Sequence, residues 1–346
     1  MGNRPGMEGV AKPQCFITGT GRCGSTVLSR MLMRHPDALV LREFFSTLDA
    51  RRFAAGPVDA PTLASILSAD RHPVLPFLQR GGTMPEILYR LSEAQRREPG
   101  LQVPGLQLVA LPYLTDDPAR LYAETIEWAR SQPSRRLAEH YPALFGFLRA
   151  QTGRRVAIEA SATNNVDLEV FPYCRVLHVH RSGPEVVLSM AQHPFFRLMA
   201  ALALDPLTAE QWAVVRARLA RDEDDPLVAR MAVRPSPRLD TFLAHTWTTA
   251  VARNVRMLGR LPREHVLELA FEDLLASPEA TLQRVAEFFG LSPDPVWARD
   301  VATMLRPVEL RLPGLEPDRQ RELARLCAVG QILTGREQRE RLDLLG

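Results

Sequence analysis

The stretch CFITGTGRCGSTVLSRML, residues 15–32, constrains the fold of this chain more than any other segment. A short apolar run leads into a glycine-rich turn, and a helical pattern follows. The spacing of Gly19, four residues, Gly24, Ser25 and Thr26 is that of a Walker A loop, but Ser25 stands where that motif has its lysine. A strand, a glycine-rich loop and a helix in this order indicate an α/β protein with an anion-binding loop.

Three further segments have the composition of buried strands. Residues 155–161, 174–181 and 265–272 are short, β-branched and mostly apolar. Helical patterns follow the last two, and the second of these helices is expected to begin after Ser277 as N-cap and to end before Gly290. Alternation of strands and helices predicts a central parallel β-sheet flanked by helices, with ligands beyond the carboxyl ends of the strands.

The stretches between these strands are long and mainly helical in pattern. We predict one domain over residues 1–346, with helical insertions at about 44–150 and 195–240 that shape the substrate side of the sheet. Helices are expected within both insertions, at 117–132 in the first and at 208–225 in the second.

Composition excludes several classes of protein. A net charge of +3 is too small to indicate nucleic acid as a partner. No apolar run approaches the roughly 18 residues of a membrane span, and no leader pattern begins the chain, so we expect a cytoplasmic protein without an integral membrane segment. The four scattered cysteines predict neither a disulfide framework nor a zinc site.

The choice of basic residue also constrains the site. Lys12 is the only lysine, so an anion site must use arginine, whose planar fork suits phosphate and sulfate oxygens. Arg22 places such a charge inside the glycine-rich turn, and Arg181 ends the second predicted strand where a triphosphatase would have a magnesium-binding aspartate. The residues expected to contact a bound anion are Gly21, Arg22, Cys23, Gly24, Ser25 and Thr26. Taken alone, the glycine spacing also fits a tight strand–helix turn with a surface arginine.

A second motif makes the pattern specific. RSGPEVVLS, residues 181–189, together with the loop, resembles the sulfotransferases that use 3′-phosphoadenosine 5′-phosphosulfate (PAPS). That family lacks the Walker lysine, carries a lysine or arginine at the position of Arg22, and has an arginine at a strand end with a serine eight residues later, here Arg181 and Ser189. FPYCRVLHVHR before this motif and LPREHVLELAFEDLLASPEATLQRVAEFFGL near the C-terminus also resemble the family.

The resemblance implies a P-loop NTPase-like sulfotransferase fold of the bacterial type. It implies PAPS as donor, adenosine 3′,5′-bisphosphate (PAP) as product, and no metal. Arg22 would neutralise charge on the leaving oxygen, and Arg181 and Ser189 would bind the 3′-phosphate. Phe271, in place of the family's tyrosine, would keep an aromatic ring at the nucleotide.

The resemblance also suggests the base that accepts the acceptor's proton. Glu43 follows the HPD turn at the position of a base in one branch of the family. His35 and His193 are the other candidates, although a histidine at a helix end also has structural uses. His178 and His180 lie on a predicted buried strand and are expected to be core residues.

Two positions depart from the family pattern. Val27 replaces a tryptophan that stacks on adenine, and Ala160 replaces a lysine near the reacting centre. The leading hypothesis is transfer of a sulfuryl group to a hydroxyl of a small metabolite, glycan or lipid. The alternatives are a divergent P-loop kinase that uses ATP and Mg²⁺, and a catalytically inactive protein that binds PAP or PAPS. Oligomeric state is left open.

Overall fold

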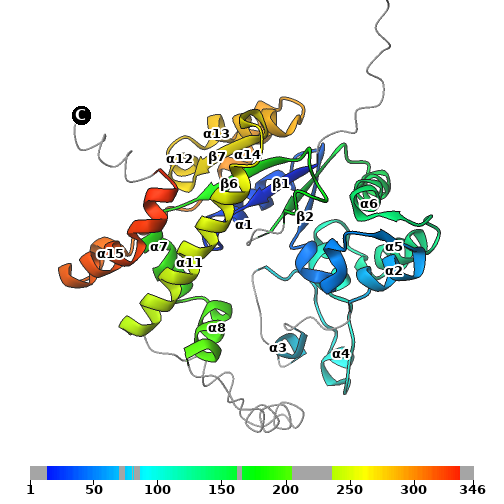
Figure 1. Ribbon diagram of the computed structural model, residues 1–346, viewed down its shortest axis with the longest axis horizontal. Coiled ribbons are helices and arrows are strands. Elements are labelled where there is room, and N and C mark those ends of the chain that lie inside the picture. Colours follow the sequence, from blue (N-terminus) through cyan, green and yellow to red (C-terminus); the bar gives the residue numbers. More distant parts are fainter. Residues whose placement is uncertain are drawn as a thin grey trace, which may run out of the picture.

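The centre of the protein is a five-stranded parallel sheet with the order β2-β5-β1-β6-β7 (Figure 1). The computed structural model describes residues 14–69, 75–79, 81, 86–161, 166–204 and 236–335. The strands are β1 (Cys15–Thr18), β2 (Ala38–Arg42), β5 (Val156–Ala160), β6 (Arg175–His180) and β7 (Val266–Ala270). The predicted parallel sheet and four of its strands are confirmed, whereas β2 was not predicted.

Both faces of the sheet are buried, which explains why its strands have apolar side chains at consecutive positions. Phe16, Leu39 and Leu41 belong to one apolar core, and Ile17 and Val40 belong to a second one. Because side chains alternate along a strand, neighbouring residues supply opposite cores.

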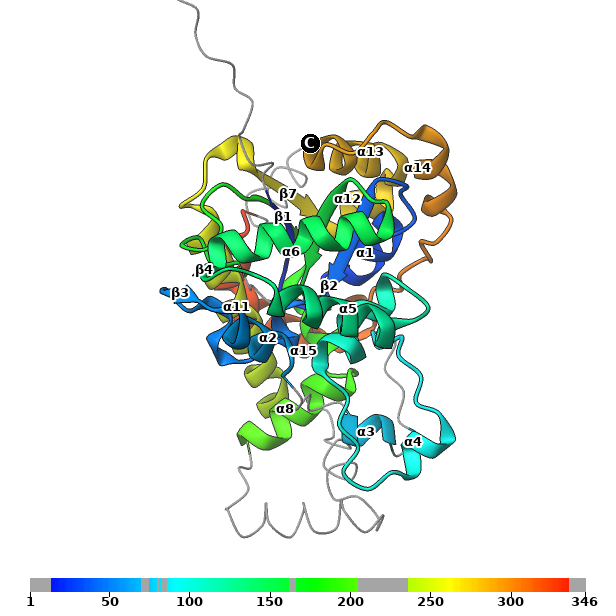
Figure 2. The same ribbon diagram turned by 90° about the vertical axis from the view of Figure 1, so that its right-hand side faces the viewer.

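Helices cover both faces of the sheet. Three helices from the stretch predicted to be an insertion pack on the first core, to the right of the sheet in Figure 1: α2 (Ala60–Leu67), α5 (Pro118–Arg130) and α6 (Leu137–Thr152). The second core is closed by α1 (Ser25–Leu32), α12 (Phe271–Ala276), α13 (Pro278–Phe289) and α14 (Pro295–Ala302). Figure 2 shows α1 beside α13 and α14. The helix predicted at 117–132 is confirmed as α5.

A third apolar cluster joins α7 (Gly183–Met190), α11 (Pro237–Leu258) and α15 (Pro317–Leu333). Trp247 of α11 is 1% exposed and packs against Gly183 and Gly330, where a Cβ would lie 2.5 Å and 2.3 Å from its ring. The cluster therefore fixes α7, which contains most of the predicted motif at 181–189, against α11.

The remaining described elements are short, apart from α8. They are η1 (Phe45–Thr47), η2 (Ala50–Phe53), β3 (Pro57–Val58), α3 (Leu75–Gln79), α4 (Glu93–Arg97), η3 (Leu106–Ala110), η4 (Leu111–Tyr113), β4 (Arg135–Arg136), α8 (Pro194–Leu204), η5 (Arg263–His265) and η6 (Leu312–Gly314). β3 and β4 form a separate antiparallel pair. The helix predicted at 208–225 lies outside the described residues.

One predicted helix cap differs from expectation. Ser277 occupies the N-cap position of α13, but its side chain makes no capping hydrogen bond. α12 runs directly into α13, and the Ser277 N–H donates to the carbonyl of Asp273, so its backbone serves the end of one helix and the start of the next. Gly290 ends α13 with a φ of 71°, as predicted.

Within the described residues, no helix combines the length and apolar character needed to cross a membrane.

Candidate functional site

The glycine-rich loop between β1 and α1 has the form of an anion cradle. The backbone N–H groups of residues 21–24 donate to no acceptor among the described residues. Gly24 has a φ of 97°, and a Cβ there would lie 2.1 Å from Cδ2 of Phe271. Unpaired N–H groups at the positive end of a helix attract an oxyanion. The loop is therefore shaped by Gly24 and left with donors for a ligand.

A side chain from α11 holds the start of this loop. Asn254 is fully buried, and its Nδ2 donates to the carbonyl oxygen of Gly19 at 3.0 Å. Gly19 itself has no room for a Cβ, which would lie 2.4 Å from Sγ of Cys23. Nothing in the sequence around Asn254 indicated this role, because the contact joins residues far apart in the chain.

Arg22 joins the loop to the second predicted motif. Its Nε donates to the Oγ of Ser189, on α7, at 3.2 Å. Its Nη1 donates to Oε1 of Glu86 at 3.4 Å. Two residues predicted at the site, Arg22 and Ser189, are thus brought together, and Glu86 is a partner that the sequence did not reveal.

Glu86 also contacts a predicted histidine. Its Oε1 lies 3.6 Å from Nε2 of His193, and its Oε2 is buried without a hydrogen-bond partner among the described residues. Burial would raise the pKa of Glu86, but the hydrogen bond and charge of His193, with the charge of Arg22, lower it to about 2. Glu86 is therefore a carboxylate held against the loop arginine.

Arg181 lies just beyond β6 in a second part of the site. It is 7% exposed, its Nη2 donates to Oε2 of Glu185 at 3.4 Å, and its Cζ lies 5.4 Å from the centre of the Phe271 ring. Glu185 also accepts from the backbone N–H of Leu312 at 2.8 Å. Burial lowers the pKa of Arg181, Glu185 opposes this, and repulsion from Arg311 adds to the lowering. Arg311 is a further cation near Arg181 that the sequence did not reveal.

Glu43 stands directly after β2. Its N–H donates to the carbonyl of Ala160 at 3.0 Å, and its Oε2 accepts from the Oγ of Ser46 at 3.4 Å. Glu43 has a φ of 52° and Arg22 a φ of 56°, and these are the two non-glycine residues with positive φ in the described part of the chain. Such conformations are strained and cluster at functional sites. No contact found among the described residues joins Glu43 to Arg22.

A second carboxyl group lies beneath Glu43. Glu159 of β5 is 1% exposed and accepts a hydrogen bond from the Oγ of Ser161. Burial raises its pKa to about 8 and the charge of Glu43 adds to the increase, although hydrogen bonds from Ser161 and two backbone N–H groups oppose it. A glutamate within the apolar strand 155–161 was a visible anomaly in the sequence that could have drawn attention to this residue.

The histidines divide into structural and site residues. His35 is fully buried, its Nδ1 accepts from the N–H of Asp37 at 3.1 Å, and its Nε2 lies 3.0 Å from the carbonyl oxygen of Ser292. Both ring nitrogens are therefore engaged, Nδ1 within its own turn and Nε2 with the distant Ser292, which makes His35 unsuitable as a base. His178 and His180 are buried as predicted, and burial lowers the pKa of His178 to about 4.

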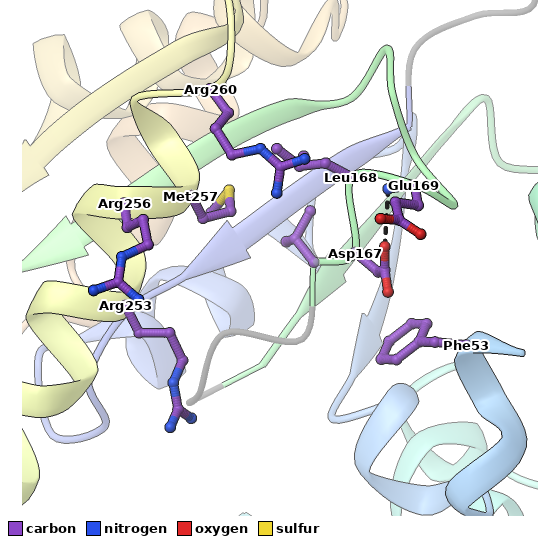
Figure 3. A pocket seen from close by; sticks show the side chains of 9 residues that line it. Phe53, Asp167, Leu168, Glu169, Arg253, Arg256, Met257 and Arg260 are labelled. Atoms are coloured by element: carbon purple, nitrogen blue, oxygen red, sulfur yellow. Dashed lines mark hydrogen bonds between the residues drawn. The ribbon is translucent and has the colours of Figure 1, made fainter. Parts of the chain in front are cut away.

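A pocket of about 450 Å³ lies apart from these residues (Figure 3). Arg253 and Arg256 of α11, with Arg260 just beyond its end, stand on one side of it, and Asp167 and Phe53 on the other. None of the predicted site residues lines it. Among the described residues, no group of histidine, cysteine, aspartate and glutamate side chains could hold a metal ion.

The loop, the arginine beyond β6 and the carboxylate beyond β2 lie at the carboxyl end of one parallel sheet, which defines a nucleotide- or anion-binding α/β protein. The model of the family described as "Sulfotransferase family" matches residues 221–295, which include the whole of α11, β7, α12 and α13. This match confirms the predicted resemblance to sulfotransferases in that part of the chain.

Solved structures of sulfotransferases are only distantly similar to the chain. A sulfotransferase domain of the Synechococcus PCC 7002 olefin synthase is 19% identical, with 91% of this chain and 93% of that chain covered and a TM-score of 0.39. The sulfotransferase of Alicyclobacillus acidocaldarius is 20% identical, with 94% and 95% covered and a TM-score of 0.38. One from Mycobacterium tuberculosis is 17% identical, with 92% and 77% covered and a TM-score of 0.42. At these TM-scores the structures carry no argument, so the resemblance to sulfotransferases rests on the family match and the motifs. The comparison with curated proteins gave no match.

Proposed function

We propose that the chain transfers a sulfuryl group from PAPS to a hydroxyl group of a small metabolite, glycan or lipid, and releases PAP. The observation that carries the proposal is the 3.2 Å contact between Arg22 and Ser189, which are 167 residues apart. It joins the loop that would hold the 5′-phosphosulfate to the helix that would hold the 3′-phosphate. A donor with both groups can therefore span the two motifs.

The loop supplies donors to the 5′ end of PAPS. The free N–H groups of residues 21–24, with the hydroxyls of Ser25 and Thr26, would bind the phosphosulfate oxygens. Each charge-assisted hydrogen bond of this kind contributes about 1.5–3 kcal/mol. Arg181 with Ser189 would bind the 3′-phosphate, and the Phe271 ring packed on Gly24 would border the nucleotide.

The reaction is an in-line transfer in which Glu43 takes the proton. The acceptor oxygen forms a bond to sulfur, its proton passes to the Glu43 carboxylate, and the bond between sulfur and the bridging oxygen breaks. The electron pair of that bond stays on the 5′-phosphate of PAP, where Arg22 stabilises the charge. The left-handed backbone of both residues supports their assignment to the reacting centre.

His193 is a second candidate for the base, because its Nε2 faces Glu86 and its Nδ1 has no hydrogen-bond partner among the described residues. A carboxylate on one ring nitrogen and a free second nitrogen is the arrangement of a general base. Glu43 is preferred because it follows the HPD turn at the position of the family's base, whereas Glu86 already engages both His193 and Arg22.

The hypothesis of a kinase is weaker than that of a sulfotransferase for two reasons. Ser25 replaces the Walker lysine, and the strand end that would carry a magnesium-binding aspartate carries Arg181 instead. The hypothesis of a catalytically inactive PAP-binding protein rests on Val27 and Ala160. Only a measurement of turnover separates it from the transferase.

The test is transfer of labelled sulfate from PAPS to compounds in an extract of the source cell. Glu43→Gln should retain PAP binding and lose most turnover, while His193→Gln, as the matched variant, should retain both. Full turnover by Glu43→Gln with loss in His193→Gln would move the base to His193. No transfer by the wild-type protein that nevertheless binds PAP would favour the inactive binder.

A further inference from the structure

Arg42, the last residue of β2, is a buried cation without a carboxylate partner. It is 2% exposed, no carboxylate of the described residues lies within ion-pair distance of it, and its Nε has no hydrogen-bond partner there. Arg181, which is almost as buried, has Glu185 at 3.4 Å. Burying an arginine without an anion is costly, so the surroundings of Arg42 are short of one negative charge.

The guanidinium of Arg42 is directed to the glycine-rich loop. Its Nη2 donates to the hydroxyl of Thr26 and its Nη1 to the carbonyl oxygen of Thr26, each at 3.4 Å. The ring of Tyr113 lies on the guanidinium, with Cζ 5.5 Å from its centre, and the Tyr113 hydroxyl donates to the carbonyl of Glu86 at 2.6 Å. Thr26 and Tyr113 are neutral, so they orient Arg42 and leave its charge uncompensated.

Thr26 has a defined place in Walker loops. It is the hydroxyl residue two positions after Gly24, and in nucleotide triphosphatases the hydroxyl at this position binds the Mg²⁺ that neutralises the phosphates. In this chain the atom beside that hydroxyl is an arginine nitrogen. A fixed positive charge therefore stands where the related loops hold a metal ion.

We propose that Arg42 supplies this charge to the 5′-phosphosulfate of the bound donor. The inference rests on the proposed function. As the bond between sulfur and the bridging oxygen breaks, its electron pair stays on the 5′-phosphate, and Arg42 shares with Arg22 the stabilisation of that charge. Arg42 pairs in register with Ala160, so its side chain leaves the same face of the sheet as the position where the sequence lacks a second cation.

The test compares two nucleotides that differ only at the 5′ end. Binding of PAP and of adenosine 3′-monophosphate is measured by calorimetry for wild type, Arg42→Met and Arg42→Lys. Arg175→Met is the control. Arg175 is also a strand arginine, but it lies at the start of β6, away from the carboxyl end of the sheet, and its Nη1 donates to the carbonyl of Phe288.

Arg42→Met should lose about ten- to a hundredfold in PAP affinity, the value of one charge-assisted hydrogen bond, and bind the monophosphate as wild type does. Arg42→Lys should recover part of the PAP affinity, and Arg175→Met should leave both affinities unchanged. Without ligand, Arg42→Met should melt no lower than wild type, because an uncompensated buried charge is gone.

Two results overturn the inference. Equal loss for both nucleotides with a lower melting temperature would mean that Arg42 is structural, and unchanged PAP binding by Arg42→Met would mean that it does not contact the 5′ end. In either case PAP binding by the wild type would leave the proposed function standing. A wild-type protein that does not bind PAP would refute the proposed function itself and this inference with it.

Discussion

Replacing Glu159 with glutamine should change how the stability of this protein depends on pH. The carboxyl group of Glu159 is 1% exposed and lies below Glu43 in the middle strands of the sheet. Burial raises its pKa from an ordinary 4.5 to about 8, with a contribution from the charge of Glu43. A carboxyl group with a raised pKa stays protonated in the folded state while it ionises in the unfolded chain.

The sign and size of the pH effect on the free energy of unfolding follow from this difference in pKa. The contribution of Glu159 to the free energy of unfolding is fully favourable below its unfolded-state pKa of 4.5. It is lost as the pH rises through its folded-state pKa of about 8. At about 1.4 kcal/mol per pKa unit, the folded protein loses roughly 3–4 kcal/mol of unfolding free energy between pH 5 and pH 8 through this one group. Glutamine cannot ionise, so Glu159→Gln should not show that loss.

The assay is urea unfolding of wild type and Glu159→Gln at a series of pH values from 5 to 8. The difference between the two proteins cancels the titration of all other groups, and it should grow in favour of the variant as the pH rises. Glu268→Gln, a substitution of an exposed glutamate on β7, is the control and should follow the wild type. Parallel curves for wild type and Glu159→Gln would contradict this prediction, because Glu159 would then be ionised in the folded state or accessible to water.

Three further perturbations test the loop. Glu86→Gln removes the carboxylate that pairs with Arg22, whose side chain is 33% exposed, so PAP affinity should rise by no more than about fivefold; weaker binding would mean that Glu86 supports the site. Gly24→Ala should lower the melting temperature and abolish PAP binding, through about 1–3 kcal/mol of backbone strain plus the clash with Phe271, while Gly314→Ala, in open space, should change neither. Asn254→Ala should cost about 1–3 kcal/mol in urea unfolding and weaken PAP binding, and an unchanged affinity would show that the Gly19 contact does not shape the loop.

The fold could be predicted where local pattern and burial agree. Strands β1, β5, β6 and β7 are short and mostly apolar, and this leaves a clear signal in the sequence. β2 was missed although it is equally buried, because its five residues end in Arg42, are followed by Glu43 and come directly after the HPD turn. Polar residues at its end hid the strand, and those residues belong to the candidate site.

The site could be predicted only in its local parts. The loop from Gly19 to Thr26 and the spacing of Arg181 and Ser189 are visible as motifs, because each is set by a short stretch of backbone. Glu86 and Asn254 reach the loop across 64 and 235 residues, and such contacts arise from packing of whole elements. Their sequence surroundings resemble ordinary insertion and helix residues, so pattern alone had no means to select them.

We propose that the site binds a nucleotide with phosphates at both the 3′ and 5′ positions. Calorimetric titration of the wild-type protein with PAP in the absence of metal, and with ATP in the presence of Mg²⁺, tests it most directly. We expect PAP to bind, ATP with Mg²⁺ to bind far more weakly, and Arg181→Ala to lose the PAP signal. Binding of ATP with Mg²⁺ and none of PAP would contradict it.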